Sequence, residues 1–343
     1  MILLKQEVLD KLNGNVEGVR AALQHAIELE HSTIPVYLYT LYSLRPGANQ
    51  QVAAIIRSVV VEEMLHMTLA CNLLNAIGGA PSIDHPGFIP KYPGPLPGGV
   101  DDGLIVSLAP MSIEHVHKVF MGIEEPETPL RFKSLTFAEE QPITIGMFYG
   151  QISKQLQESY FIGDHSLQVV ADWWPSGELF AITNLDEARR AINIIVEQGE
   201  GTTLEPLNLE GEYAHYYRFA EIVHGRRLIK NPDAKPGSPP DQQYVYGGAA
   251  VDFDPSQVQP LPSNPGLQPY PSSSGAQVPV DSFNATYTNL LRCLHQVFNG
   301  HPNLLRSAIG TMENLKEQAR EISTIPVGGG TFAGPTFQYR PFN

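Results

Sequence analysis

A long apolar stripe in the first quarter of the chain constrains the fold more than any other feature. Over residues 52–77, apolar side chains recur every third or fourth position, as they do on the buried face of one long helix. Glu63 and His66 interrupt this stripe at its middle. Because an unpaired buried carboxylate is costly, the two residues need a shared partner, and a metal ion suits Glu-x-x-His on one helix face. The neighbouring Glu62 falls off the stripe, and we expect it to be solvated.

One Glu-x-x-His motif is weak evidence by itself. The spacing is common by chance, and a single buried histidine is more often a hydrogen-bonded core residue than a metal ligand. A second motif would reverse this judgement. Glu212 and His215 provide it within GEYAHYYRFAEIVHGRR, followed by Phe219 and Ile222 on the same face of an expected helix.

The first long helix carries a similar acid. A helix predicted over residues 16–43 has Glu30 at the middle of its apolar stripe. Pro35 lies inside this helix and removes one backbone hydrogen bond, so we expect a distortion near Glu30. The short turn at 45–49 makes this helix and the next antiparallel neighbours, with Glu30 and Glu63 at matching height.

The helix predicted over residues 185–201 offers two acids near its end. Glu200 continues the apolar row of Ile192 and Val196, whereas Glu197 continues a polar row. The periodicity therefore favours Glu200 as the side chain that faces the core, with Glu197 as the alternative.

Together these motifs form the inventory of a dinuclear metal centre in a four-helix bundle. Four carboxylates and two imidazoles neutralise two divalent metal ions and leave coordination positions open for oxygen. We expect the ions to be iron, with manganese as the alternative. The predicted ligands are Glu30, Glu63, His66, Glu200, Glu212 and His215.

Composition limits the partners and the location. A net charge of −14, with no basic cluster beyond Arg226 and Arg227, argues against a nucleic-acid partner. The two cysteines, Cys71 and Cys293, lie in predicted helices, so we expect no disulfide framework and a reducing, cytoplasmic location. The chain shows no run of about 18 apolar residues and no signal-peptide pattern, so we expect no membrane partner. A small-molecule substrate is the expected partner, and a homo-oligomer is compatible with the sequence.

Composition also divides the chain into three regions. Residues 1–230 hold every predicted ligand and form the expected bundle, with long irregular loops such as the Pro- and Gly-rich stretch at 78–110. Residues 231–282 are rich in Pro, Gly and Ser and are expected to wrap around the body. Residues 283–343 form a helical C-terminal extension, broken at 299–302, and an extended tail.

Several blocks of the sequence resemble a known family. They are AIELEHSTIPVYLYTLYSL, VVVEEMLHMTLACNLLNAIGGAPSI, TIGMFYGQI, and INIIVEQGEGT with AHYYRFAEIVHGR. Residues 16–230 resemble the bacterial ferritin-like family that includes the ferritin-like domain of iminophenyl-pyruvate dimer synthases, from violacein- and rebeccamycin-type indole pathways. The resemblance implies a mostly all-α protein, a ferritin-like four-helix bundle, with a non-haem di-metal site.

One position departs from the family pattern. Relatives often carry Glu in the IGxFY block, where this chain has Met147. If that block lies on the third bundle helix, the resemblance implies that one ligand is missing. Glu197 and Glu200 would then lie on the fourth helix, and His215 would be supplementary.

We therefore expect an oxidoreductase that acts on a small organic substrate, with the metals activating oxygen or peroxide. Tyr37 or Tyr216 could lie near the site, although core packing is the simpler explanation for both. The long loops after Gly78 and Tyr160 could form a pocket wall, which favours an enzyme. The alternatives are iron binding or storage without substrate turnover, and a scaffold with a degenerate metal site.

Overall fold

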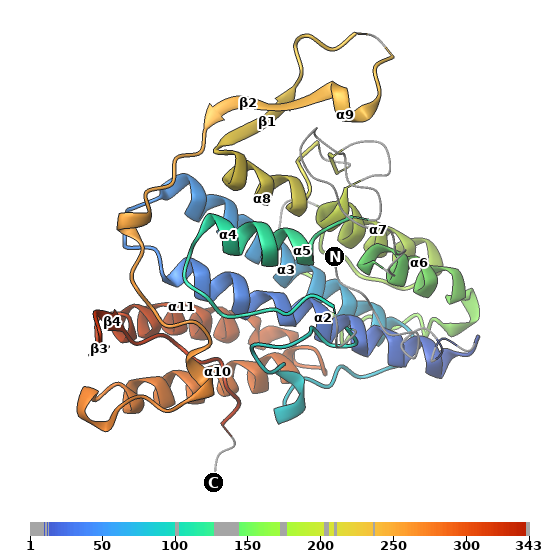
Figure 1. Cartoon of the computed structure of the whole chain (residues 1–343). Coiled ribbons are helices and arrows are strands. Elements are labelled where there is room, and N and C mark those ends of the chain that lie inside the picture. Colours follow the sequence, from blue (N-terminus) through green and yellow to red (C-terminus); the bar gives the residue numbers. More distant parts are fainter. Residues whose placement is uncertain are drawn as a thin grey trace.

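Two long antiparallel helices form the centre of the molecule (Figure 1). They are α2 (Val16–Tyr42) and α3 (Gln50–Ala76), each 27 residues long. The side chain of Asn15 caps α2 by accepting a hydrogen bond from the amide of Gly18 at 2.9 Å. The computed structural model describes residues 10, 12, 14–99, 103–126, 144–171, 177–201, 206–208, 211–235 and 237–340.

Shorter helices complete the bundle. A π-helical turn over residues 116–120 joins α4 to α5, so that the three form one helical segment. This turn packs against α8, and α6 packs against α7 (Figure 1). In contrast to the two long helices of the first half, the second half of the bundle is thus built from short helices. Their bounds are α4 (Ile113–His115), α5 (Met121–Ile123), α6 (Ile145–Gln155), α7 (Leu185–Glu200) and α8 (His215–His224).

The chain after α8 adds a hairpin and a helical pair. Strand β1 (Arg226–Lys230) pairs antiparallel with β2 (Tyr244–Ala250), and the single-turn helix α9 (Pro240–Gln243) precedes β2. Helices α10 (Gln277–Val297) and α11 (Leu305–Ile322) pack against each other, and β3 (Pro326–Gly328) pairs with β4 (Thr331–Phe332). Figure 1 shows α10 and α11 on the side of α2 and α3 opposite α8.

The helical pair shares its core with the bundle. Phe283 and Leu291 of α10 belong to the same hydrophobic cluster as Val19 of α2 and Val59 of α3. The mostly helical bundle with a helical C-terminal extension, predicted from the sequence, is confirmed, and the break between α10 and α11 falls at the predicted place. The division into residues 1–230, 231–282 and 283–343 stays a prediction.

A segment from the Pro-rich region crosses the turn between α2 and α3. We call residues 252–259 the strap. The amide of Asp254 donates to the side chain of Asn49 at 2.7 Å, and the amide of Gln259 donates to the carbonyl of Ser43 at 2.7 Å. The strap therefore holds the turn that sets the two long helices against each other. Within the described ranges, no helix has both the length and the apolar character that a bilayer crossing requires.

Candidate metal centre

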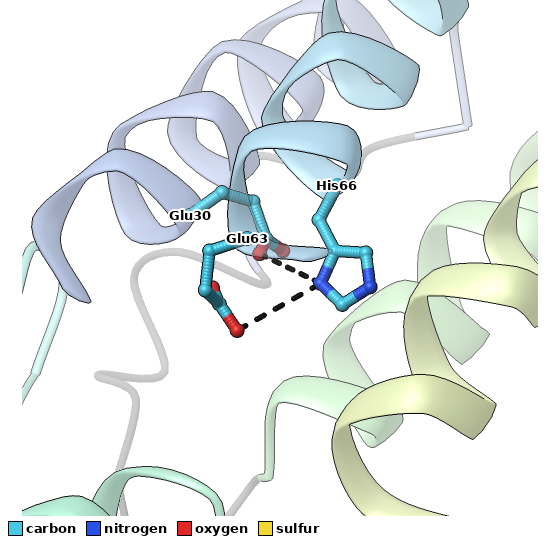
Figure 2. A group of neighbouring side chains, drawn as sticks. All are labelled: Glu30, Glu63 and His66. Carbon is cyan, nitrogen blue, oxygen red and sulfur yellow. Dashed lines mark ion pairs between the residues drawn. The ribbon is translucent and has the colours of Figure 1, made fainter. Parts of the chain in front are cut away.

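The two long helices bring Glu30, Glu63 and His66 together (Figure 2). All three side chains are buried, at 5%, 3% and 2% exposure. Nδ1 of His66 lies 3.6 Å from Oε2 of Glu30 and 3.9 Å from Oε1 of Glu63. The apolar stripes of α2 and α3 turn these side chains inward, because they occupy mid-stripe positions on facing helices.

A second group, made of Glu63, Glu124 and His215, lies beside the first. Glu124 directly follows α5, and His215 is the first residue of α8. Nδ1 of His215 lies 2.9 Å from Oε1 of Glu63 and 3.4 Å from Oε2 of Glu124. Glu63 belongs to both groups, so its carboxylate lies between two clusters of one further carboxylate and one imidazole each.

Three of these four distances, at 3.4, 3.6 and 3.9 Å, suit two ligands of one metal ion better than a direct hydrogen bond. Two ligand atoms bound to one ion at about 2.1 Å lie about 3.0 Å apart when the angle between them is about 90°, and up to about 4.2 Å apart when they lie on opposite sides of the ion. The two contacts of His66, at 3.6 and 3.9 Å, are too long for charge-assisted hydrogen bonds. Nδ1 of His215 has no hydrogen-bond partner although Glu63 is close, so this nitrogen is not aimed at a carboxylate oxygen. The donor set therefore fits a pair of divalent ions with Glu63 shared between them.

A carboxylate holds the far nitrogen of His215. Nε2 of His215 lies 2.9 Å from Oε2 of Glu62, and Nη1 of Arg218 donates to Oε1 of Glu62 at 2.8 Å. An outer partner of this kind fixes which ring nitrogen carries the proton and leaves the other free to bind a metal. In this arrangement Nδ1 of His215 is the atom that would bind a metal ion.

An amide holds the far nitrogen of His66. Nε2 of His66 lies 2.8 Å from Oε1 of Gln198, whose Nε2 donates to Oε1 of Glu178 at 2.8 Å. Gln198 is buried on α7, one turn after Ile194 and Ile195. The two imidazoles thus share one orientation, with Nδ1 toward the carboxylates. Nε2 of His215 contacts a charged partner, Glu62, whereas Nε2 of His66 contacts a neutral one, Gln198.

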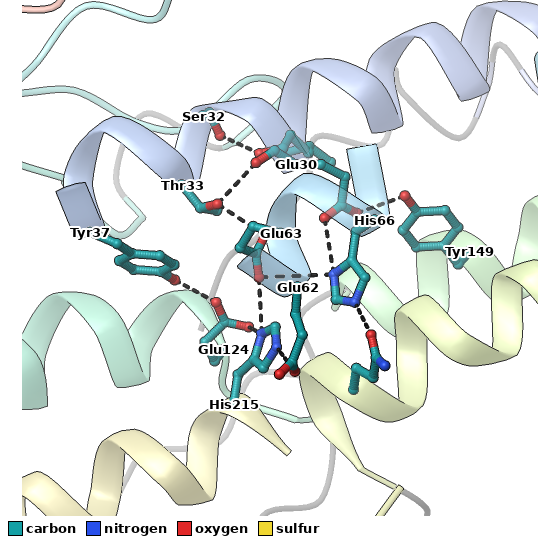
Figure 3. A network of polar contacts seen from close by, with 12 residues as sticks. Glu30, Ser32, Thr33, Tyr37, Glu62, Glu63, His66, Glu124, Tyr149 and His215 are labelled. Carbon is teal, nitrogen blue, oxygen red and sulfur yellow. Dashed lines mark hydrogen bonds and ion pairs between the residues drawn. The ribbon is translucent and has the colours of Figure 1, made fainter. Parts of the chain in front are cut away.

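Hydroxyl groups orient the three carboxylates (Figure 3). Tyr149 donates to Oε1 of Glu30 at 2.6 Å, and Thr33 donates to Oε2 of Glu63 at 3.0 Å. Tyr37 donates a short hydrogen bond to Oε1 of Glu124. Each carboxylate therefore keeps one oxygen on a buried donor while the other oxygen faces an imidazole.

The electrostatics show a site that binds positive charge. Burial, together with the nearby charge of Glu124, raises the pKa of Glu63 to about 7. Burial by itself would lower the pKa of His215, but the neighbouring carboxylates of Glu124, Glu62 and Glu63 raise that pKa well above its ordinary value. Burial opposes ionisation of Glu62 as well, yet His215 and Arg218 lower its pKa to about 2. Protons or metal ions must neutralise so many buried acids.

The structure brings four of the six predicted ligands together, namely Glu30, Glu63, His66 and His215. Glu212 does not join them. It is exposed and lies before the start of α8, so the helical spacing that would place it beside His215 does not apply, and this prediction of its position is wrong. Glu200 is the last residue of α7, and its side chain lies outside the described part of the chain, as a result of which the choice between Glu200 and Glu197 stays open.

Sequence reasoning missed Glu124 and misjudged Glu62. No sequence pattern singles out Glu124, which directly follows α5 and reaches the centre from the end of that helix. Glu62 was expected to be solvated, but only 16% of its side chain is exposed, because His215 and Arg218 cover it.

The IGxFY block contributes a tyrosine to the centre. Met147 is half-buried on α6, and Tyr149 from the same helix donates to Glu30. Of the two tyrosines singled out from the sequence, Tyr37 lies at the centre through Glu124, whereas Tyr216 packs edge-on against Tyr217 with ring centroids 5.2 Å apart.

Comparisons with known proteins agree with this architecture. A crystal structure of a ferritin-like protein from Caulobacter vibrioides, at 1.95 Å resolution, has the same fold, with a TM-score of 0.61 and 22% sequence identity over 95% of this chain and 99% of that one. No curated protein matches the chain. The Ferritin-like family model matches residues 23–224, more than half of the sequence, and these residues include every member of both Glu/His groups. The chain therefore belongs to the ferritin-like family.

Proposed function

We propose that the chain is a non-haem di-metal carboxylate oxidoreductase that acts on a small organic substrate with oxygen or peroxide. The observation that carries the proposal is the pair of Glu/His groups that share Glu63. We expect two ions per chain, iron in preference to manganese. Bound iron would supply the activation of oxygen or peroxide, because it keeps coordination positions that protein ligands do not fill.

The residues around the centre support chemistry rather than simple binding. Tyr37 and Tyr149 each donate a hydrogen bond from a buried hydroxyl to a carboxylate that belongs to one group only, Glu124 and Glu30 respectively. Burial and the neighbouring acids raise the pKa values of both tyrosines well above the ordinary value, so each stays protonated and keeps its hydrogen bond. The carboxylates are thereby held in one orientation, which an oxidation site needs in order to present the same open positions at each turnover.

A narrower proposal follows from the sequence blocks that resemble the ferritin-like domain of iminophenyl-pyruvate dimer synthases. We propose that the chain is related to that subgroup and acts in the cytoplasm. The blocks around Glu30, Glu63 and Tyr149 are the part of the resemblance that lies at the centre.

Anaerobic loading with ferrous iron, followed by exposure to oxygen, tests the function. For an oxidoreductase, we expect about two ferrous ions per chain to bind, and we expect iron oxidation to stop once these are oxidised, because further turnover needs an organic substrate. Absorption spectra and oxygen consumption would report both quantities.

Two other outcomes would contradict the proposal. Continued oxidation of many ferrous ions per chain, with mineral formation, would identify an iron-storage protein. No iron binding in the wild-type chain after mild reconstitution would identify a scaffold with a degenerate site.

A further inference from the structure

A second site lies on the opposite side of the two long helices from the metal centre. A cavity of about 660 Å³ separates α2 and α3 from α10 and α11. This volume lies in the range of pockets that hold small organic ligands, about 300–1,000 Å³. None of the residues in the two Glu/His groups lines it.

The walls of the cavity are mainly apolar. Residues from all four helices line it, among them Ile34 of α2, Val60 of α3, Leu291 of α10 and Ile309 of α11. Of the described lining residues, only His31 has a buried side-chain polar atom, Nδ1, without a hydrogen-bond partner. The deep part of the cavity therefore suits an apolar body that makes few hydrogen bonds there.

The charges at the cavity differ from those of the whole chain. The lining includes four basic residues, Arg45, Arg57, Lys316 and Arg320, and one acid, Glu313. The full sequence has the reverse balance, with 36 acidic and 22 basic residues. A positive rim on an acidic protein selects an anionic ligand.

Two of these basic residues are available to a ligand. Lys316 pairs with Glu313 at 2.9 Å, and Arg320 pairs with Glu317 at 2.7 Å. Arg45 and Arg57 are exposed and form no ion pair with any residue that the structure describes. Arg45 lies in the turn between α2 and α3 and Arg57 lies in the first half of α3, whereas His31 and Thr68 line the cavity farther from the turn and are buried.

We propose that this cavity binds a long-chain monocarboxylate, a fatty acid or a molecule of that chemistry. The carboxylate lies at Arg45 and Arg57, where a guanidinium offers a fork of donors that matches it. The acyl chain runs between the helical pair and the bundle toward His31 and Phe298. Since no described metal ligand lines the cavity, this site is independent of the proposed oxidoreductase function.

Displacement of a fluorescent fatty acid by palmitate, on the full-length chain and below the micellar concentration, tests the proposal. We expect saturable binding of palmitate, weaker binding of octanoate, and little binding of methyl palmitate. The double variant R45E/R57E should bind palmitate at least about tenfold more weakly, because it replaces charge-assisted hydrogen bonds with repulsion. The matched control R189E changes an exposed arginine on α7 and should bind like the wild type.

A second variant keeps the test independent of the surface charge. Ile309 is half-buried and lines the cavity, so Ile309→Trp should fill part of it and weaken palmitate binding while the melting temperature stays near that of the wild type. Binding should persist after chelation has removed metals.

Several results would overturn the proposal. One is equal binding of palmitate and its methyl ester, and another is unchanged palmitate binding in R45E/R57E. A third is a wild-type chain that does not bind palmitate and self-associates through this face in sedimentation experiments.

Discussion

The two halves of the candidate metal centre are built on helices of different kinds. Glu30, Glu63 and His66 lie in the middle of two 27-residue helices, whereas Glu124 and His215 lie at the ends of short ones. A mid-helix ligand is fixed by packing on the turns before and after it. A terminal ligand has a full turn on one side only, and the hydrogen bonds from Tyr37 to Glu124 and between Glu62 and His215 supply the missing constraint. The second half therefore depends more strongly on its outer partners.

Glu63 belongs to both Glu/His groups, so its loss should affect both halves of the centre. We expect Glu63→Gln to abolish the binding of both ions, because it removes the only described ligand that belongs to both groups. Metal content after reconstitution, measured by mass spectrometry, should fall from about two ions per chain to near zero. Retention of one tightly bound ion would show that the carboxylate serves a single position.

Removal of the Glu124 carboxylate should affect metal binding in the second half only. We expect Glu124→Gln to leave about one ion per chain, held by Glu30, Glu63 and His66, since Glu124 belongs to the second group alone. Isothermal titration with ferrous or cobaltous ion checks the stoichiometry. The matched control is Glu212→Gln, which changes an exposed acid from the original motif and should keep both ions. If Glu212→Gln lost an ion and Glu124→Gln did not, the assignment of the second half would have to be abandoned.

The outer partners should differ in importance. We expect Glu62→Gln to weaken metal binding at the second position about 10- to 100-fold, the usual cost of losing a partner outside the first coordination shell. Gln198→Leu should have a smaller effect at the first position, because packing of α3 holds His66 and its partner is neutral. Titration curves for the two variants give both affinities. Equal losses would show that terminal and mid-helix ligands depend on their partners alike.

The smallest expected effect concerns the stability of the segment formed by α4, the π-helical turn and α5. Burial lowers the pKa of His115 on α4 from 6.5 to about 4. Between these values the unfolded chain binds more protons than the folded one, so stability falls as the pH decreases from 6.5 toward 4. From pH 7 to pH 5, we expect the metal-free wild type to lose about 1–2 kcal/mol more than His115→Leu.

Urea unfolding at the two pH values measures this difference. His165→Leu is the matched control, since His165 is exposed, and it should behave like the wild type. A parallel loss in wild type and His115→Leu would mean that the α4 segment tolerates the charged imidazole, so that this side is more open than its burial indicates.

The sequence predicts the positions of Glu30, Glu63 and His66 well. Periodicity over α2 and α3 places Glu30, Glu63 and His66 inward, and the short turn sets the two helices in register, so local patterns suffice. The same patterns predict the helical fold and the interruption between α10 and α11.

The second half could not be predicted by periodicity. Glu124 follows a π-helical turn, which shifts the rotation of the side chains that come after it, and α5 is only three residues long. His215 begins a helix, so Glu212, three residues earlier, lies outside the helical geometry on which the motif depends. Glu62 looked solvated because its partners, His215 and Arg218, come from a helix about 150 residues later in the chain. Long-range contacts of this kind leave no local pattern.

The strap has a consequence for the order of events during synthesis. Synthesis of the described residues of the two Glu/His groups is complete once the ribosome has added His215. The strap that holds the α2–α3 turn comes later, at residues 252–259, and the helical pair α10–α11 comes after the strap. A contact such as that between Asn49 and Asp254 spans 205 positions, and contacts of such separation form late and slow the folding of a chain. The nascent bundle thus leaves the ribosome before α10 and α11 can cover the apolar side of α2 and α3. During that interval it presents the surface that chaperones recognise, and truncation before residue 252 would make this exposure permanent.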